Sequence, residues 1–243
     1  MAEAHCEWGP NGIASLRGRA GVFVIVDVLS FSTCVDIATG RGAQILPFPL
    51  GDHAAAEERA REVGALVATH RMGPGPYSLS PATLQTIPAG TRLVLPSPNG
   101  SKLSVLAAQG GAAVFAGGLR NASAVAKAAR ATGGDIAVIP AGERWESDDS
   151  LRPAIEDLIG AGAILEALDL SLSPEARVAR DAFRAAKDDL ASIVGGSMSG
   201  RELIDRGYPQ DVALAVQYDV SITAPRLCDG AYRDGGIQSA VSK

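Results

Sequence analysis

The stretch Val22-Phe-Val-Ile-Val26 is a continuous run of apolar side chains, and Asp27 follows it directly. A run without polar alternation is typical of a strand that is buried on both faces of a parallel sheet. A helix-like stretch follows, Gly40-Arg41-Gly42 ends it, and residues 43–48 again have the composition of a strand. The segment therefore predicts a β-α-β unit with a carboxylate at the end of its first strand.

Strand-like and helix-like segments alternate around this unit from residue 20 to residue 168. Further strands are expected at 65–68, 92–95, 113–116 and 135–139, and further helices at 54–63, up to 108, at 121–131, from Pro153, and from Ser173 to Gly195-Gly196. This alternation predicts a three-layer α/β/α fold with a mostly parallel or mixed sheet. We expect residues 1–243 to form a single domain, or two closely packed halves.

Residues 26–46 can be laid on residues 95–115 without gaps. Either the chain holds an internal pseudo-repeat, or the likeness is that of any two β-α-β units. Both interpretations predict the same architecture.

The composition excludes several classes of function. The net charge is −5 and Lys and Arg form no block, so a nucleic-acid partner is not expected. The three cysteines show no CxxC spacing, which favours a reducing compartment. No signal peptide is evident, and the longest apolar run, residues 21–38, is interrupted by Asp27 and Asp36. We expect a soluble cytoplasmic protein without a membrane partner, and its oligomeric state is left open, with a homodimer as one option.

Asp27 is the first candidate site residue. In open parallel sheets, ligands bind beyond the carboxyl ends of the strands, and Asp27 closes a fully apolar strand. A buried carboxylate needs a metal, a cation or several donors, so we favour a functional role over the alternative that Asp27 only caps the following turn. A haloacid-type phosphatase is excluded, because that class needs a second acid two residues later, where Leu29 stands.

The turn Ser97-Pro98-Asn99-Gly100-Ser101 is the second candidate site. It lies between a strand and a helix, where backbone N–H groups favour anions, and Gly100 lets the chain approach a ligand closely. Ser97, Asn99, Gly100 and Ser101 are therefore the candidate phosphate-binding residues. The alternative is an ordinary Asn-Gly turn with Ser101 as the helix cap.

Acids and arginines of other segments can complete a site for an anionic substrate. Glu143 follows a strand in a glycine-bearing loop and is a metal-ligand candidate by position. Glu156 and Asp157 lie in the first turn of a helix, where acids usually complement the helix dipole. Arg71 and Arg201 stand near glycines and are candidates to clamp an anionic substrate, although most arginines are merely solvated.

The histidines argue against a zinc site. His5, His53 and His70 show no ligand spacing, which excludes a zinc hydrolase of the HExxH type. The GxxxxGK[ST] phosphate-binding pattern occurs nowhere, and residues 195–200 do not fit the serine-hydrolase elbow. A hard-cation site of oxygen ligands remains, and its expected metal is Mg²⁺.

Five stretches together resemble the 2-phosphosulfolactate phosphatase (ComB-like) family, in order and approximate spacing over nearly the whole chain. They are Val26-Asp-Val-Leu29 with Ser32-Thr33, Pro96-Ser-Pro-Asn-Gly-Ser101, Arg120-Asn-Ala-Ser-Ala-Val125, Ile155-Glu-Asp-Leu-Ile-Gly-Ala-Gly-Ala163, and Ser199-Gly-Arg-Glu-Leu203 followed by Asp211 and Asp219. The resemblance implies the α/β fold of that family and Mg²⁺-assisted hydrolysis of the phosphate ester of a small sulfonated hydroxy acid. It raises Glu156 and Asp157 above a helix-dipole role and makes both candidate metal ligands beside Asp27 and Glu143. The site residues that it marks are Asp27, Asn99, Gly100, Asn121, Glu156, Asp157 and Arg201.

The chain departs from the family pattern at three positions. The pattern has an arginine where this chain has Ser30, a cysteine near Pro140 and a histidine near Ser199. Loss of the arginine removes a bidentate anion contact, and loss of the thiol removes any nucleophile of that kind. We therefore expect the substrate to be 2-phosphosulfolactate or a related phosphorylated hydroxy acid, and we infer no pathway.

The sequence thus predicts a phosphoric monoester hydrolase with Asp27, Arg71 and Arg201 as its catalytic residues. In this hypothesis Asp27 holds Mg²⁺ together with Glu156 or Glu143, and the amides of residues 99–101 cradle the phosphate. The alternative is a non-catalytic binder of small anions on the same fold. Both hypotheses require residues 27, 99 and 156 to meet at one rim of the sheet.

Overall fold

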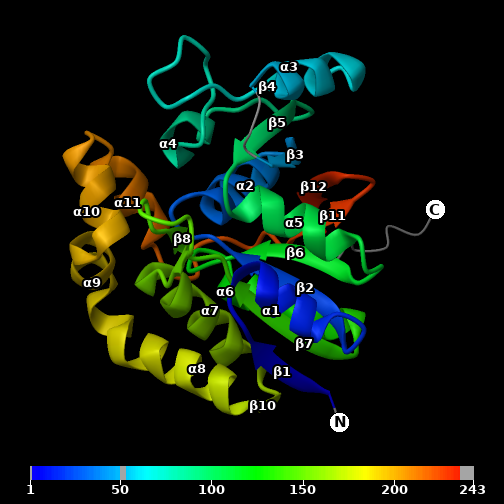
Figure 1. Ribbon diagram of the computed structural model, residues 1–243, viewed down its shortest axis with the longest axis vertical. Coiled ribbons are helices and arrows are strands. Elements are labelled where there is room, and N and C mark those ends of the chain that lie inside the picture. Colours follow the sequence, from blue (N-terminus) through cyan, green and yellow to red (C-terminus); the bar gives the residue numbers. More distant parts are fainter. Residues whose placement is uncertain (1, 50–52, 236–243) are drawn as a thin grey trace.

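The computed structural model describes residues 2–49 and 53–235. Within them, ten strands form one sheet with helices on both faces, which confirms the predicted three-layer α/β/α fold (Figure 1). In spatial order the strands are β10 (Ser171–Leu172), β1 (Glu3–Cys6), β7 (Asp135–Pro140), β2 (Ala20–Val26), β6 (Ala113–Gly117), β11 (Pro225–Cys228), β12 (Ala231–Asp234), β3 (Gln44–Pro49), β5 (Arg92–Ser97) and β4 (Leu66–Val67). The sheet is mixed, because the hairpin β11–β12 runs antiparallel to its neighbours β6 and β3 while the other pairs are parallel.

Strand β2 lies inside the sheet, and its side chains are buried on both faces. Val22, Val24 and Val26 pack into one apolar core, and Phe23 and Ile25 pack into the other. All five are at most 1% exposed. Burial of each such side chain stabilises the fold by about 1.5–3 kcal/mol. The unbroken apolar run is therefore the sequence mark of a strand between two helical layers.

The helices form the two outer layers. On the first core lie α6 (Ala122–Thr132) and α7 (Ile155–Leu168), and α8 (Pro174–Ala186) packs against α7. On the second core lie α1 (Gly9–Leu16), α2 (Phe31–Gly40) and α5 (Gly100–Ala108). The smaller elements are α3 (His53–Glu62), α4 (Pro81–Leu84), the hairpin of β8 (Glu143–Arg144) and β9 (Leu151–Arg152), the 3₁₀ turn Lys187–Asp189, α9 (Leu190–Gly196), α10 (Met198–Asp205) and α11 (Pro209–Ala215). In the described part of the chain, no helix is both long enough and apolar enough to cross a bilayer.

The glycines of α7 have a packing role. A Cβ atom on Gly162 would lie 2.1 Å from the carbonyl oxygen of Ala179, and one on Gly160 would lie 2.6 Å from Val28 Cγ2. These separations are too short for any side chain. The small residues of this segment therefore let α7 approach both α8 and the end of β2.

Several local predictions were wrong. Helix α7 begins at Ile155 with Ala154 as its N-cap, so Pro153 precedes the helix and does not open it. The long helix predicted from Ser173 is broken at the 3₁₀ turn, although Ser173 does cap its start by accepting the N–H of Ala176 at 3.3 Å. The strands β1, β10, β11 and β12 and the helix α1 were not predicted.

Residues 26–46 and residues 95–115, the two segments with similar sequence patterns, lie beside each other in the sheet. Strand β2 of the first pairs with β6 of the second, and β3 of the first pairs with β5 of the second, all in parallel. This pairing does not show duplication, so the pseudo-repeat stays a prediction, as does the division into domains.

Candidate active site

Asp27 ends β2, and its carboxylate joins the starts of two helices. Oδ1 accepts the backbone N–H of Phe31 at 3.1 Å, and Oδ2 accepts the N–H of Gly100 at 2.8 Å. The residue is 6% exposed. The capping interpretation is therefore correct for the start of α2, and the same carboxylate also contacts the predicted anion-binding turn, 73 residues away.

Gly100 fits this place because it lacks a side chain. A Cβ atom there would lie 2.3 Å from Phe31 Cδ1 and 2.8 Å from Asp27 Oδ2. The close approach that the sequence predicted for Gly100 is thus an approach to Asp27, and its N–H is donated to that carboxylate.

The hydroxyl groups of the same turn have different surroundings. The alternative in which Ser101 caps the helix is wrong, because Asn99 takes the N-cap position and the Ser101 hydroxyl donates to the Leu95 carbonyl at 2.8 Å. Ser97 is fully buried, and its hydroxyl has no hydrogen-bond partner among the described residues. Ser97 is therefore the hydroxyl of this turn without a partner in the described chain, and its role in phosphate binding stays a prediction.

Glu143 approaches the turn from the β8–β9 hairpin. Its Oε2 accepts a hydrogen bond from Asn99 Nδ2 at 2.8 Å. Burial raises the pKa of the Glu143 carboxyl to about 7, and the negative charges of Asp27 and Glu156 add to the rise. Glu143 therefore exchanges a proton close to neutral pH.

The acid pair at the start of α7 divides into two roles. Asp157 Oδ1 accepts the N–H of Val28 at 2.7 Å, and Oδ2 accepts the N–H of Gly142 at 2.9 Å. Asp157 thus connects the segments that follow β2 and β7. Glu156 is 2% exposed, and no hydrogen bond to its carboxylate is found within residues 2–49 and 53–235. Glu156 is the acid of the pair that remains available.

We call Asp27, Glu143, Glu156 and Asp157 the acidic cluster. Burial raises the pKa of Asp27, and Glu156 adds to the rise, while the N–H groups that bind Asp27 and the Arg71 guanidinium oppose it. Burial also raises the pKa of Asp157 well above its usual range, and Asp27, Glu156 and Glu143 all contribute in the same direction. The cluster brings four acids close enough to repel one another, so it favours a bound cation or bound protons.

Arg71 lies beside the acidic cluster in the loop after β4. Its Nη2 donates to the Ser30 hydroxyl at 2.9 Å, and its Nε lies 3.4 Å from Asp211 Oδ2. Asp211 is fully buried and also accepts the Ser80 hydroxyl at 2.6 Å. The Arg71 guanidinium is also 5.5 Å from the centroid of the Tyr208 ring. Arg71 is therefore held by a buried carboxylate, a hydroxyl and an aromatic ring.

Arg152 is a further residue of the site that the sequence did not reveal. It lies directly across the β8–β9 hairpin from Glu143 and is 7% exposed. Its positive charge opposes the rise in the pKa of Glu143. Its position, four residues before Glu156 and beside Pro153, was the only available signal, and a lone arginine there is usually solvated.

Arg71 and Arg152 contact the residues at two of the positions where the chain departs from the family pattern. Ser30, at the position of the family's arginine, accepts the hydrogen bond from Arg71. Ser199, near the position of its histidine, accepts one from Arg152 Nη2 at 3.4 Å. At the third departure the chain has Pro140 and therefore no thiol. Elsewhere, in α2, the thiol of Cys34 is buried, and burial raises its pKa well above its usual range. The guanidinium of Arg71 thus brings a positive charge to Ser30, although Arg71 comes from another part of the chain than the family's arginine.

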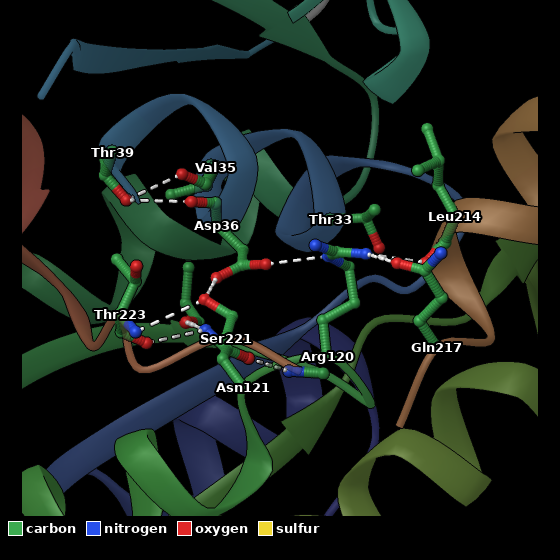
Figure 2. A network of polar contacts seen from close by, with 12 residues as sticks. Thr33, Val35, Asp36, Thr39, Arg120, Asn121, Leu214, Gln217, Ser221 and Thr223 are labelled. Carbon is green, nitrogen blue, oxygen red and sulfur yellow. Dashed lines mark hydrogen bonds and ion pairs between the residues drawn. The ribbon is translucent and has the colours of Figure 1, made fainter. Parts of the chain in front are cut away.

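Two predicted site residues lie apart from the acidic cluster. Arg201 is exposed on α10, and no hydrogen bond or ion pair within the described residues joins it to the cluster. Asn121 is buried, accepts the N–H of Gly118 at 3.0 Å and donates to the Thr223 carbonyl at 3.2 Å (Figure 2). Asn121 is the N-cap residue of α6, but its side chain accepts no N–H group of that helix and belongs to a different polar network, which also contains Asp36 and Arg120.

The acidic cluster has suitable donors for a hard cation. Carboxylate oxygens are the usual ligands of Mg²⁺, and Glu156 has no protein donor to neutralise it among the described residues. However, in that part of the chain no three His, Cys, Asp or Glu side chains already have the arrangement of a metal site. The donor chemistry therefore fits Mg²⁺, and metal binding stays a prediction.

The fold and the site define an α/β protein with buried acids and two arginines where its parallel strands end. This class suits the binding of small anions, and its members include hydrolases of phosphate esters. The model of the 2-phosphosulpholactate phosphatase family matches residues 12–230, which contain the entire site. The chain belongs to this family of phosphoric monoester hydrolases, as the resemblance implied.

Curated relatives match over most of their length. The 2-phosphosulfolactate phosphatase of Methanothermobacter thermautotrophicus is 31% identical over 90% of this chain and 90% of its own. Proteins named probable 2-phosphosulfolactate phosphatase are 26% identical in Pseudothermotoga lettingae, over 84% of this chain and 88% of the relative, and 29% identical in Deinococcus radiodurans, over 86% and 88%. The similarity therefore spans the whole fold.

Proposed function

We propose that this chain is a Mg²⁺-dependent phosphatase that hydrolyses the phosphate ester of a small acidic molecule, 2-phosphosulfolactate or a related phosphorylated hydroxy acid. The observation that carries the proposal is the gathering of four acids in the acidic cluster, with the charge of Arg71 acting on Asp27 and with Arg152 directly across the β8–β9 hairpin from Glu143. Membership of the family supports the reaction class, and the names of the relatives support the substrate. The cytoplasmic location, a homodimer and the lack of a nucleic-acid partner stay predictions.

Asp27, together with Glu156 or Glu143, would hold Mg²⁺. The ion, when bound, supplies a Lewis acid that polarises the phosphoryl group. Asp27 is the best oriented of the three, because two backbone N–H groups fix its carboxylate. Glu156 adds an oxygen ligand that carries no competing hydrogen bond within the described chain.

The chain's own residues orient the substrate and move the proton. Arg71, fixed by Ser30 and Asp211, presents its remaining N–H groups to a non-bridging phosphoryl oxygen and stabilises the charge that develops there. Where Glu156 is the second ligand, Glu143 stays free of the ion, and its carboxyl group, with a pKa raised to about 7, takes a proton from the attacking water or gives one to the leaving alkoxide.

Phosphate release from a panel of phosphorylated hydroxy acids tests the proposal. We expect turnover of 2-phosphosulfolactate by the wild type with Mg²⁺, and loss of turnover with EDTA that added Mg²⁺ reverses. Asp27→Asn is expected to lower turnover about 1000-fold, because an amide neither binds Mg²⁺ as well nor accepts both N–H groups. The matched control is Asp188→Asn, an exposed aspartate outside the site.

Other outcomes would change the proposal in defined ways. Unchanged turnover by Asp27→Asn would remove Asp27 from the chemistry. Thermal stabilisation by the same esters without any phosphate release would favour the non-catalytic binder.

A further inference from the structure

Arg152 is buried, yet less neutralises its charge than that of the partly buried Arg71 and Arg120. The Arg152 guanidinium donates one long hydrogen bond, to Ser199 Oγ at 3.4 Å, and the nearest acid is Glu202, at 3.7 Å and 42% exposed. The ring of Trp145 lies 5.8 Å away. A guanidinium has five N–H donors, so most of its capacity is unused within the described residues.

Two other arginines of the described chain have a buried carboxylate as ion-pair partner. Arg120 donates to Asp36 at 2.8 Å, and Arg71 faces Asp211 at 3.4 Å. Both of these aspartates are at most 2% exposed. A buried cation without such a partner is costly, so Arg152 is built to receive an anion from outside the chain.

The position of Arg152 places this anion next to the chemistry. Arg152 pairs across the β8–β9 hairpin with Glu143, and Glu143 accepts a hydrogen bond from Asn99 in the turn that binds Asp27. Arg71 donates to Ser30, three residues after Asp27, whereas Arg152 lies opposite Glu143 on the hairpin. The two guanidinium groups are thus associated with different members of the acidic cluster.

We infer that Arg152 binds the acid group of the substrate that does not carry the phosphate, a carboxylate or sulfonate, and so selects acidic phosphate esters. This inference rests on the proposed function for the identity of the ligand. A planar guanidinium with free donors can form two parallel hydrogen bonds to such an oxyanion. Arg71 then remains for the phosphoryl group.

The experiment compares binding of sulfolactate and of inorganic phosphate to wild type and Arg152→Met in calorimetric titrations. We expect sulfolactate affinity to fall about 100-fold and phosphate affinity to change less than about threefold, because one bidentate ion pair is lost. In turnover of 2-phosphosulfolactate, KM should rise much more than kcat falls. Arg152→Lys should recover only part of the affinity, and the exposed Arg206→Met is the matched control.

A structural role is separated by the stability of the ligand-free protein. Arg152→Met should keep or raise the melting temperature, because it removes a poorly neutralised charge, whereas Arg71→Met should lower it by leaving Asp211 unpaired. Equal loss of sulfolactate and phosphate binding, unchanged sulfolactate binding, or a fall in melting temperature as large as that of Arg71→Met would each overturn the inference. A wild type that binds sulfolactate but releases no phosphate would overturn the proposed function and leave this test in force.

Discussion

Buried acids occur in two regions of this molecule, and their surroundings are opposite. In the network of Figure 2, Asp36 accepts hydrogen bonds from Arg120 Nε at 2.8 Å and from the Ser221 hydroxyl at 2.6 Å. Burial raises the pKa of Asp36, and both partners oppose the rise. In the acidic cluster, by contrast, the neighbours of Glu143 include Asp27 and Glu156, which increase the rise.

The difference separates a structural acid from one that awaits a ligand. The Asp36 network joins α2 to the segment before α6 and to the segment before β11, and its charges cancel. The acidic cluster keeps negative charges together at the cost of stability, which is typical of a site that binds a cation. Neutral amide substitutions should therefore have opposite effects on stability in the two regions.

The largest effect is expected in the Asp36 network. Asp36→Asn should lower the free energy of unfolding by about 3 kcal/mol, because it leaves the partly buried Arg120 without its carboxylate. Urea unfolding of the variant and the wild type measures the change, with Asp188→Asn as the control. A loss below about 1 kcal/mol would show that this pair behaves like an exposed ion pair.

An intermediate effect with a pH dependence is expected at Glu143. Its pKa is raised from 4.5 to about 7 in the folded protein, so the protonated form is favoured by folding. The stability from this group is complete below pH 4.5 and is lost as pH rises through about 7. In EDTA, the wild type should therefore be more stable at pH 5 than at pH 8, and Glu143→Gln should reduce the difference by about 2 kcal/mol. An unchanged difference would exclude Glu143 as its source.

The smallest effect is expected at Glu156. In EDTA at pH 8, Glu156→Gln should raise the free energy of unfolding by about 1 kcal/mol, since it removes a charge that repels Asp27 and Asp157. Thermal unfolding measures this gain, and the same scans with Mg²⁺ should show a smaller stabilisation than in the wild type. If the variant is less stable than the wild type, Glu156 has a stabilising partner and the comparison fails at this position.

Local patterns predicted the layers of the fold but not the way the sheet is completed. The run that forms β2 needs helices on both faces, and that requirement is visible in the sequence. Strand β1 has four residues and pairs with β7, far along the chain, so no local period marks it. The hairpin β11–β12 also has short strands, which depend on neighbours more than 100 residues away.

The sequence predicted those site residues whose place along the chain already indicates their role. Asp27 and the turn around Gly100 meet, as the sequence hypothesis required, although the three antiparallel pairings from β6 to β3 make β2 and β5 run in opposite directions. Arg152 and Asp211 were missed as parts of the site, because their roles depend on partners in distant segments. The division between Glu156 and Asp157 could not be predicted either, since only packing decides which carboxylate reaches Val28 and Gly142.

The order of the strands has a consequence for the nascent chain. Hairpin β11–β12 lies between β6 and β3, yet all the other strands of this sheet precede it in the described sequence. While the ribosome is still making residues 225–234, β6 and β3 each present an open edge, and open edges readily associate with other chains. We conclude that the sheet becomes continuous only after residues 225–234 have been made, and that a ribosome stalled before this hairpin would hold two unjoined sheet fragments.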